Sequence, residues 1–377
     1  MTDEAHTLLG VCDDMLARCL LTHCIDDADI MMAALLKGAT DAHEVLTGLV
    51  LSMDRATHTE RDEGMRMLER DLALGIARWG CTLRPRSRAR FSQSVERWHA
   101  RLAALPTWDA DMLRAWFTKD GALRVVTPTD DVWPHGLDDL DVRSDYAPPV
   151  CLWVRGDARA LAACSEPLAV VGSRGMNAYG REVTATLAAQ ACLGGHTVIS
   201  GGAMGVDAAA HWSAVHTLAS LSADVCGRTV AVFAGGLDRM GPSCNGRLFE
   251  AIETNHGALI SELCPDTAPL AHRFLLRNRL IAAMAGSVVV TQARLRSGAL
   301  NTARWANELN RRLYAVPGDV TSPSNAGCNE LIRNQQAMLL PDAHDVGECC
   351  HARHAPGGAV PPSEAPDGQG ADGTASE

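Results

Sequence analysis

The stretch Leu168-Ala-Val-Val-Gly-Ser-Arg174 decides the fold of this chain. An apolar run ends there in a glycine, a hydroxyl and an arginine, and a second apolar run ends in Ser200-Gly-Gly202. A segment compatible with a helix follows each run. Strand ends that carry glycines, next to helix starts with unpaired N–H groups, form the anion-binding edge of an α/β sheet. The two stretches therefore predict a phosphate-binding edge, and Arg174 points to a ligand larger than one nucleotide.

Apolar runs recur along the chain at the spacing of a doubly wound fold. They occupy residues 168–172, 197–200, 229–234, 258–261, 287–291 and 313–316. Because helical or loop segments separate these runs, we expect an α/β fold with an extended, Rossmann-like, doubly wound and mostly parallel sheet. Ligands of such sheets bind outside the carboxyl ends of the strands, where the two glycine stretches fall.

The chain divides into four parts. Residues 1–120 repeat apolar side chains at helical spacing, which predicts an N-terminal helical domain. Residues 121–164 are expected to be a connector whose short strands join the sheet domain at 165–345. Residues 346–377 are rich in glycine and proline and bury too little apolar surface to fold, so they are predicted to be a disordered tail.

Composition narrows the class of protein. The 377 residues carry a net charge of −11, yet residues 161–340 hold fourteen arginines against twelve acidic residues, so the sheet domain itself is not acidic. No apolar run reaches about twenty residues, so neither a membrane span nor a signal peptide is expected. Thirteen cysteines without a C-x-x-C pair favour reduced thiols and a cytoplasmic location. Cys349, Cys350, His351 and His354 lack a second ligand cluster, so no metal site is expected.

The turn Gly172-Ser173-Arg174 is the first candidate binding segment. It does not follow the G-x-G-x-x-G pattern of dinucleotide sites. A tight turn that needs glycine for steric reasons is the plain alternative to an anion site. Beyond Ser200-Gly201-Gly202, Asp207 lies near a helix start, and we expect it to pair with His211 one turn further on.

The segment Arg273-Phe274-Leu-Leu-Arg277-Asn278-Arg279 is the second candidate. In a single-strand site arginines bind phosphates while an aromatic face stacks on a base. The alternative is a phenylalanine in the core with solvated arginines around it.

Two further segments carry candidate contacts. In Arg294-Leu-Arg-Ser297-Gly298, we expect Ser297 to cap a helix and Gly298 to leave the first N–H groups open to an anion. The alternating arginines at 84, 86, 88 and 90 are interpreted either as a solvated face or as a secondary DNA contact.

Eight motifs occur in a characteristic order. They are Gly172-Ser-Arg, Ser200-Gly-Gly with Gly205-Val-Asp and His211, Gly235-Gly-Leu-Asp, Ser261-Glu, Phe274 with Arg277-Asn-Arg279, Ser297-Gly-Ala-Leu-Asn-Thr-Ala303, Ala315-Val-Pro-Gly318 and Gly327-Cys-Asn-Glu-Leu-Ile332. Together they resemble the DprA/Smf DNA-processing family over about residues 123 to 342. Met204 departs from the pattern, because an arginine is frequent there. The C-terminal winged helix of some members is expected to be missing.

The resemblance implies a Rossmann-like domain that binds single-stranded DNA, dimerises and loads the recombinase RecA during natural transformation. The binding set expected from the motifs and the resemblance is Gly172, Ser173, Arg174, Ser200, Gly201, Gly202, Arg273, Phe274, Arg277, Asn278, Arg279, Ser297 and Gly298. No catalytic residue, metal ligand or cofactor is expected, and the partners are single-stranded DNA, RecA and a second copy of the chain, with no membrane.

Two other interpretations remain. The phosphoribohydrolases of the lysine-decarboxylase-like group share the fold and carry a catalytic glutamate where this chain has Trp305, so the required carboxylate is missing. A sensor of small nucleotides would use the phosphate-binding edge but would leave Arg273, Arg277 and Arg279 without a role.

Overall fold

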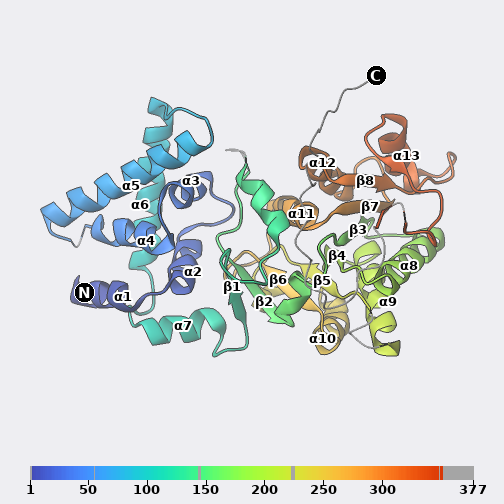
Figure 1. The fold of residues 1–377 in the computed structure, drawn as a ribbon, viewed down its shortest axis with the longest axis horizontal. Coiled ribbons are helices and arrows are strands. Elements are labelled where there is room, and N and C mark those ends of the chain that lie inside the picture. Colours follow the sequence, from blue (N-terminus) through green and yellow to red (C-terminus); the bar gives the residue numbers. More distant parts are fainter. Residues whose placement is uncertain (1, 55, 143–145, 222–225, 348, 351–377) are drawn as a thin grey trace, which may run out of the picture.

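Nine strands form a single sheet within the residues that the computed structural model describes, namely 2–54, 56–142, 146–221, 226–347 and 349–350. The strand order is β1-β2-β6-β5-β4-β3-β7-β8-β9 (Figure 1). From β6 to β9 in this order neighbouring strands run parallel, whereas β2 is antiparallel to both β1 and β6. The strands are β1 (Arg124–Val126), β2 (Leu152–Gly156), β3 (Leu168–Gly172), β4 (Val198–Gly201), β5 (Thr229–Val232), β6 (Ala258–Ser261), β7 (Ser287–Gln292), β8 (Arg312–Ala315) and β9 (Met338–Leu339).

The expected Rossmann-like α/β fold is confirmed. The apolar runs predicted as strands coincide with β3 to β8, with ends that differ by at most two residues. The short edge strand β9 was not predicted, because its two residues give no usable periodicity. Between and after the strands lie α8 (Ala178–Leu193), α9 (Val206–Ser220), α10 (Gly246–Thr254), α11 (Ala271–Met284), α12 (Ala299–Glu308) and α13 (Ala326–Arg333).

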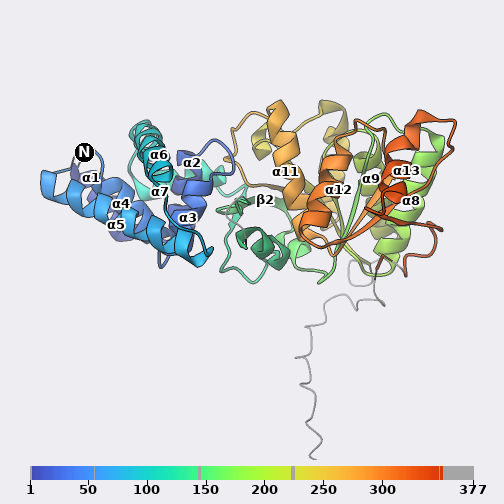
Figure 2. The ribbon, with the colours of Figure 1, turned by 90° about the horizontal axis from the view of Figure 1, so that it is seen from above.

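Alternate residues of β3 face opposite layers of helices. Leu168 and Val170 belong to the core beneath α8 and α9, while Ala169 and Val171 belong to the core beneath α11 and α12 (Figure 2). Because both faces of the parallel strands are buried, their sequences are continuous apolar runs. This arrangement leaves the carboxyl ends of β3, β4 and β7 together at one edge.

The N-terminal part is helical from Thr2 to Thr118. Its helices are α1 (Thr2–Val11), α2 (Asp14–Cys24), α3 (Ile30–Gly38), α4 (Ala42–Leu51), α5 (His58–Arg78), α6 (Pro85–Ala103) and α7 (Ala110–Thr118). Four of them start after an aspartate whose carboxylate accepts a hydrogen bond from a first-turn N–H, at Asp13, Asp29, Asp41 and Asp109. Such caps satisfy backbone donors that the helix leaves unpaired, which fixes where each helix begins.

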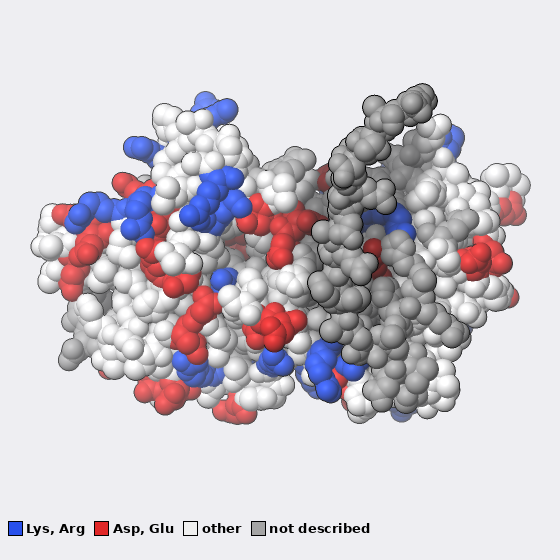
Figure 3. All heavy atoms as spheres, in the orientation of Figure 1, with Lys and Arg blue, Asp and Glu red and all other residues white. Residues whose placement is uncertain are grey.

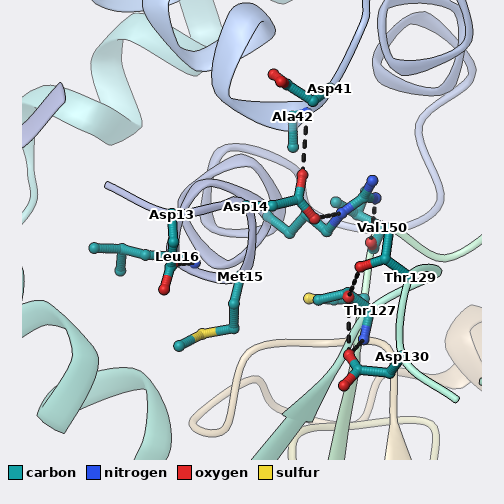
Figure 4. A network of polar contacts seen from close by, with 12 residues as sticks. Asp13, Asp14, Met15, Leu16, Asp41, Ala42, Thr127, Thr129, Asp130 and Val150 are labelled. Carbon is teal, nitrogen blue, oxygen red and sulfur yellow. Dashed lines mark hydrogen bonds and ion pairs between the residues drawn. The ribbon is translucent and has the colours of Figure 1, made fainter. Parts of the chain in front are cut away.

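Polar and apolar contacts join the helical part to the sheet. The Arg18 guanidinium donates to the Val150 carbonyl at 2.9 Å and to the Asp14 carboxylate at 2.7 Å, and Asp14 also accepts from the Ala42 N–H (Figure 4). The Trp153 indole of β2 donates to the Phe117 carbonyl at 3.0 Å. Because Trp153 and Phe117 belong to one core cluster, the helices and the antiparallel edge of the sheet share a continuous core.

The predicted tail at 346–377 lies mostly outside the described residues. At its start, Cys349 and Cys350 are each 2% exposed and pack in the same core cluster as Leu340. The folded part therefore extends at least to Cys350, a few residues beyond the predicted boundary.

Candidate functional site

A pocket of about 770 Å³ opens at the carboxyl ends of β3 and β7. One wall is the turn after β3, the opposite wall is the loop before α12, and the first half of α11 forms a third side. The side chains that make it basic are Arg174, Arg277, Arg294 and Arg296. The pocket is thus built where a doubly wound sheet binds its ligands.

Arg174 and Phe274 form the rim between this pocket and a smaller one. The guanidinium carbon of Arg174 lies 5.3 Å from the centre of the Phe274 ring, which is a cation–π distance. Both residues also line the neighbouring pocket of about 210 Å³, together with Gly202 and Met204. Phe274 is only half-buried. Arg174 thus covers one face of the ring, and the exposed part of Phe274 borders both pockets.

Arg277 is the buried cation of the pocket. It is 7% exposed, and its Nη1 donates to the Val232 carbonyl, while its Nε has no hydrogen-bond partner among the described residues. Burial lowers the pKa of Arg277 to about 10, although the nearby Asp207 carboxylate acts in the opposite direction. Burial likewise raises the pKa of Asp207, with Arg277 opposing it. A desolvated guanidinium that lines a pocket attracts an anion strongly, because the low local dielectric weakens the screening of its charge.

Gly201 lets these two charges converge. A Cβ at this position would lie 2.5 Å from Asp207 Oδ2 and 2.6 Å from Arg277 Nη1. Any larger residue would therefore displace the buried pair. Gly201 itself does not line the pocket; it acts beneath it.

The turns after β3 and β4 pack against each other. Gly205 has a φ of +81°, and its position would bring a Cβ to 2.2 Å from the Ser173 carbonyl oxygen. The Val206 N–H donates to that same carbonyl at 3.1 Å. The glycine of the second turn thus sets the position of the Gly172-Ser173-Arg174 turn, because only glycine tolerates both the dihedral angle and the close approach.

Most of the predicted binding residues come together in this pocket. Those that line it are Gly172, Ser173, Arg174, Phe274, Arg277, Asn278, Ser297 and Gly298. Ser200 is fully buried and donates to the Val170 carbonyl at 2.6 Å, so it supports the strand end without reaching the pocket.

Arg273 and Arg279 do not reach the pocket. Arg279 is 1% exposed, forms two 2.6 Å contacts with the Glu262 carboxylate and donates to the Ala147 carbonyl. Arg273 donates to Asp27 at 2.5 Å and to two backbone carbonyls. Successive helix residues are about 100° apart, so Arg279 projects from another face of α11 than Phe274 and Arg277. Arg273 lies one turn before Arg277, and its contacts with Asp27 and the two carbonyls hold its side chain away from the pocket. The expectation that all three arginines face the ligand is corrected here.

Two local expectations also change. His211 does not pair with Asp207; its ring nitrogens contact Thr229 Oγ1 at 2.7 Å and the Gly201 carbonyl at 3.0 Å. Burial lowers the pKa of His211 to about 4, so the ring is neutral near pH 7. The residue at the cap position of α12 is Gly298, and Ser297 Oγ accepts only a long 3.4 Å bond from the Ala299 N–H.

Arg294 and Arg296 are pocket residues that the predicted set omitted. Both are exposed and follow β7 directly. Their place after the carboxyl end of a central strand was the available signal, since ligands bind at that edge.

For the enzyme alternative, the relevant residue is Trp305, which stands where the phosphoribohydrolases carry their catalytic glutamate. Trp305 packs edge-on against Tyr146, with ring centres 5.0 Å apart, on the helix that follows the pocket.

In the part of the chain that is described, no cluster of three or more His, Cys, Asp or Glu residues could hold a metal ion. His351 and His354 of the cysteine–histidine cluster lie outside the described residues. None of the described helices is long and apolar enough to cross a membrane.

Fold and pocket together define a Rossmann-like protein with a basic, ligand-binding strand edge. The sequence model of the DNA recombination-mediator protein A family matches residues 124–351, and the chain belongs to this family. The resemblance inferred from the motifs is thereby confirmed.

Curated relatives and solved structures agree with this assignment. The chain is 43% identical over 231 residues to the putative DNA processing protein DprA of Mycobacterium tuberculosis, covering 60% of this chain and 57% of that protein. It is 35% identical over 207 residues to DNA processing protein DprA of Bacillus subtilis, covering 55% and 66% of the two chains. The matched region thus spans less than two thirds of the length of either relative.

The structural likeness extends beyond the matched sequence. The crystal structure of DNA processing protein A from Streptococcus pneumoniae superposes with a TM-score of 0.58 and 26% identity, covering 85% of this chain and 98% of that one. DNA processing protein A from Helicobacter pylori superposes with a TM-score of 0.50 and 27% identity, covering 59% and 92%. The description of the latter structure concerns its single-stranded DNA binding mode.

Proposed function

We propose that the pocket binds the backbone and bases of single-stranded DNA and that the chain acts as a recombination mediator. The observation that carries the proposal is the buried guanidinium of Arg277, which lines a pocket rimmed by exposed arginines. Phe274 adds an aromatic face at that rim. Phosphate-binding arginines with an aromatic stacking surface are the usual elements of a single-strand site.

The finer steps rest on family membership. We propose that the chain protects incoming single strands, loads RecA onto them during DNA-mediated transformation, and does so in the cytoplasm as a homodimer. It does this by binding, without a cofactor and without catalysis. The likeness to the H. pylori protein supports the choice of single-stranded DNA as ligand.

Fluorescence anisotropy of the full chain tests the binding step. The probes are labelled oligo-dT, the matching duplex and free mononucleotide, each titrated at several salt concentrations. We expect oligo-dT to bind tightest, with an affinity that falls as salt rises because arginines displace counterions from phosphates. Tight binding of mononucleotide with none of oligo-dT would refute the proposal in favour of a nucleotide sensor.

A matched pair of variants localises the site. Arg296→Ala removes an exposed pocket arginine and is expected to weaken oligo-dT binding about fivefold. Arg333→Ala removes an exposed arginine at the end of α13 and should leave binding unchanged. Arg333 comes shortly before β9, which runs parallel to β8, so it lies toward the amino ends of the strands, away from the pocket at their carboxyl ends. Equal losses in both variants would place the DNA elsewhere.

RecA loading needs its own measurement. RecA filament formation on protein-coated single strands, followed with and without this chain, is expected to accelerate when the chain is present. Arg296→Ala should reduce the acceleration in proportion to its loss of DNA binding. Acceleration by a variant that no longer binds oligo-dT would separate the RecA step from the pocket.

A further inference from the structure

Helix α6 concentrates positive charge in an otherwise acidic part of the chain. Residues 1–120 contain fifteen Lys and Arg against nineteen Asp and Glu, but α6 alone carries five arginines and one glutamate, Glu96. In Figure 3, Lys and Arg groups project from the upper end of the helical part, while both signs of charge are interspersed over the rest of it. α6 is therefore a helix of net positive charge in a domain whose other residues carry a net negative charge.

The arginines of α6 form a stripe. Arg86, Arg90, Arg97 and Arg101 are separated by four, seven and four residues, so they lie on one side of the helix. We call these four residues the α6 stripe. They border the face that buries Phe91, Ser94, Val95, Trp98 and Leu102. At about 1.5 Å per residue the stripe extends over about 22 Å, which is the length of several nucleotides rather than of one small anion.

The outer end of the stripe is available to a ligand. Arg86, Arg90 and Arg97 are exposed, and within the described residues no acidic side chain forms an ion pair with Arg86 or Arg90. Exposed guanidinium groups of this kind are weakly hydrated and suit bidentate contacts with phosphate oxygens.

The inner end of the stripe is connected to the pocket. Arg101 contacts the Asp26 carboxylate and the His23 carbonyl. The next residue, Asp27, binds both His272 and Arg273 at the start of α11, directly before the pocket residue Phe274. In Figure 2, α6 and α11 lie on the same side of the molecule with the loop after α2 between them. The loop after α2 therefore links the inner end of the stripe to the start of α11.

We propose that the α6 stripe is a second binding surface for the phosphates of the same DNA strand that the pocket holds. This inference rests on the proposed function, because it continues a strand whose inner nucleotides occupy the pocket. The strand leaves the pocket past Phe274, crosses the loop after α2 and follows α6 toward Arg86. Where the strand crosses this loop, the Asp26 carboxylate is paired with Arg101 and the Asp27 carboxylate with Arg273, which partly neutralises their charge.

Oligonucleotide length separates the two surfaces. Full-length protein is titrated with labelled oligo-dT of about 6 nucleotides, which fills the pocket alone, and of about 30 nucleotides, which reaches α6. The double variant Arg86→Ala/Arg90→Ala is expected to weaken binding of the long strand about tenfold and to lower its salt slope by about 1.4, as expected for the loss of two phosphate contacts. Binding of the short strand should not change.

The control variant removes the same number of positive charges as Arg86→Ala/Arg90→Ala. Arg84→Ala/Arg88→Ala removes two exposed arginines near the same end of α6 and should leave both affinities unchanged, because Arg84 precedes the helix and Arg88 lies on the side of it away from the stripe. Equal losses in the two double variants, or an unchanged affinity of Arg86→Ala/Arg90→Ala for the long strand, would overturn the inference. If the unaltered protein does not bind the short strand at all, the proposed function is refuted instead, so the two failures are distinguishable.

Discussion

Two sets of arginines on α11 have opposite roles. Arg277 lies near the Asp207 carboxylate but forms no ion pair among the described residues, and the exposed Arg174 lies beside it over Phe274. Arg273 and Arg279, by contrast, are held by the carboxylates of Asp27 and Glu262 and by carbonyl oxygens. The charge of an arginine therefore identifies a ligand site only where no carboxylate forms an ion pair with it.

The largest expected effect tests the arginines held by carboxylates. Arg279→Ala leaves the Glu262 carboxylate buried without its partner, which costs about 3–5 kcal/mol of unfolding free energy. Chemical denaturation measures this loss. Arg333→Ala, which removes an exposed partner of Glu330, should change stability by no more than about 0.5 kcal/mol. A loss in Arg279→Ala as small as in that control would mean that the pair is not structural.

The second effect lies beneath the pocket and depends on pH. His211 has a folded-state pKa of about 4, below its ordinary value of about 6.5, so the folded state favours the neutral ring. The stabilisation is complete above pH 6.5 and is lost as the pH falls toward 4, by up to about 3 kcal/mol. Denaturation curves between pH 7 and 4 for the unaltered chain and for His211→Gln measure it. If both chains lose stability equally on acidification, His211 is not the titrating group.

The third effect separates domain packing from DNA binding. Arg273→Ala removes its contacts to Asp27 and the Asp26 carbonyl, and should cost about 1–2 kcal/mol of stability, because Asp27 is only partly buried. Oligo-dT of pocket length should still bind within about twofold of the unaltered chain. A strong loss of short-strand binding at unchanged stability would return Arg273 to the ligand site.

The smallest effect tests the rim of the pocket. Phe274→Leu retains an apolar side chain but removes the ring over which Arg174 lies, and should weaken oligo-dT binding by about 1 kcal/mol. Leu270→Ala alters an exposed apolar residue at the start of the same helix that lines neither pocket, and provides a control for nonspecific changes in α11. Equal affinities for the two variants would show that no base stacks on Phe274.

The pattern of strand ends was readable from the sequence because it is local. Continuous apolar runs that stop at Gly172-Ser173-Arg174 and at Ser200-Gly201-Gly202 predict parallel strands and the edge at which ligands bind. The order of eight motifs indicated the family. The missed pocket residues Arg294 and Arg296 obey the same rule, so the sequence contained the signal for them as well.

The partners of the arginines were not readable, because they come from residues far apart in the chain. Arg273 meets Asp27, and Arg279 meets Glu262 and the carbonyl of Ala147. The sequence by itself determined the Rossmann-like sheet, its basic edge and the family, since periodicity and strand ends are properties of neighbouring residues. Only the tertiary structure decided which arginines are left for a ligand, because burial and ion pairing depend on which elements pack together.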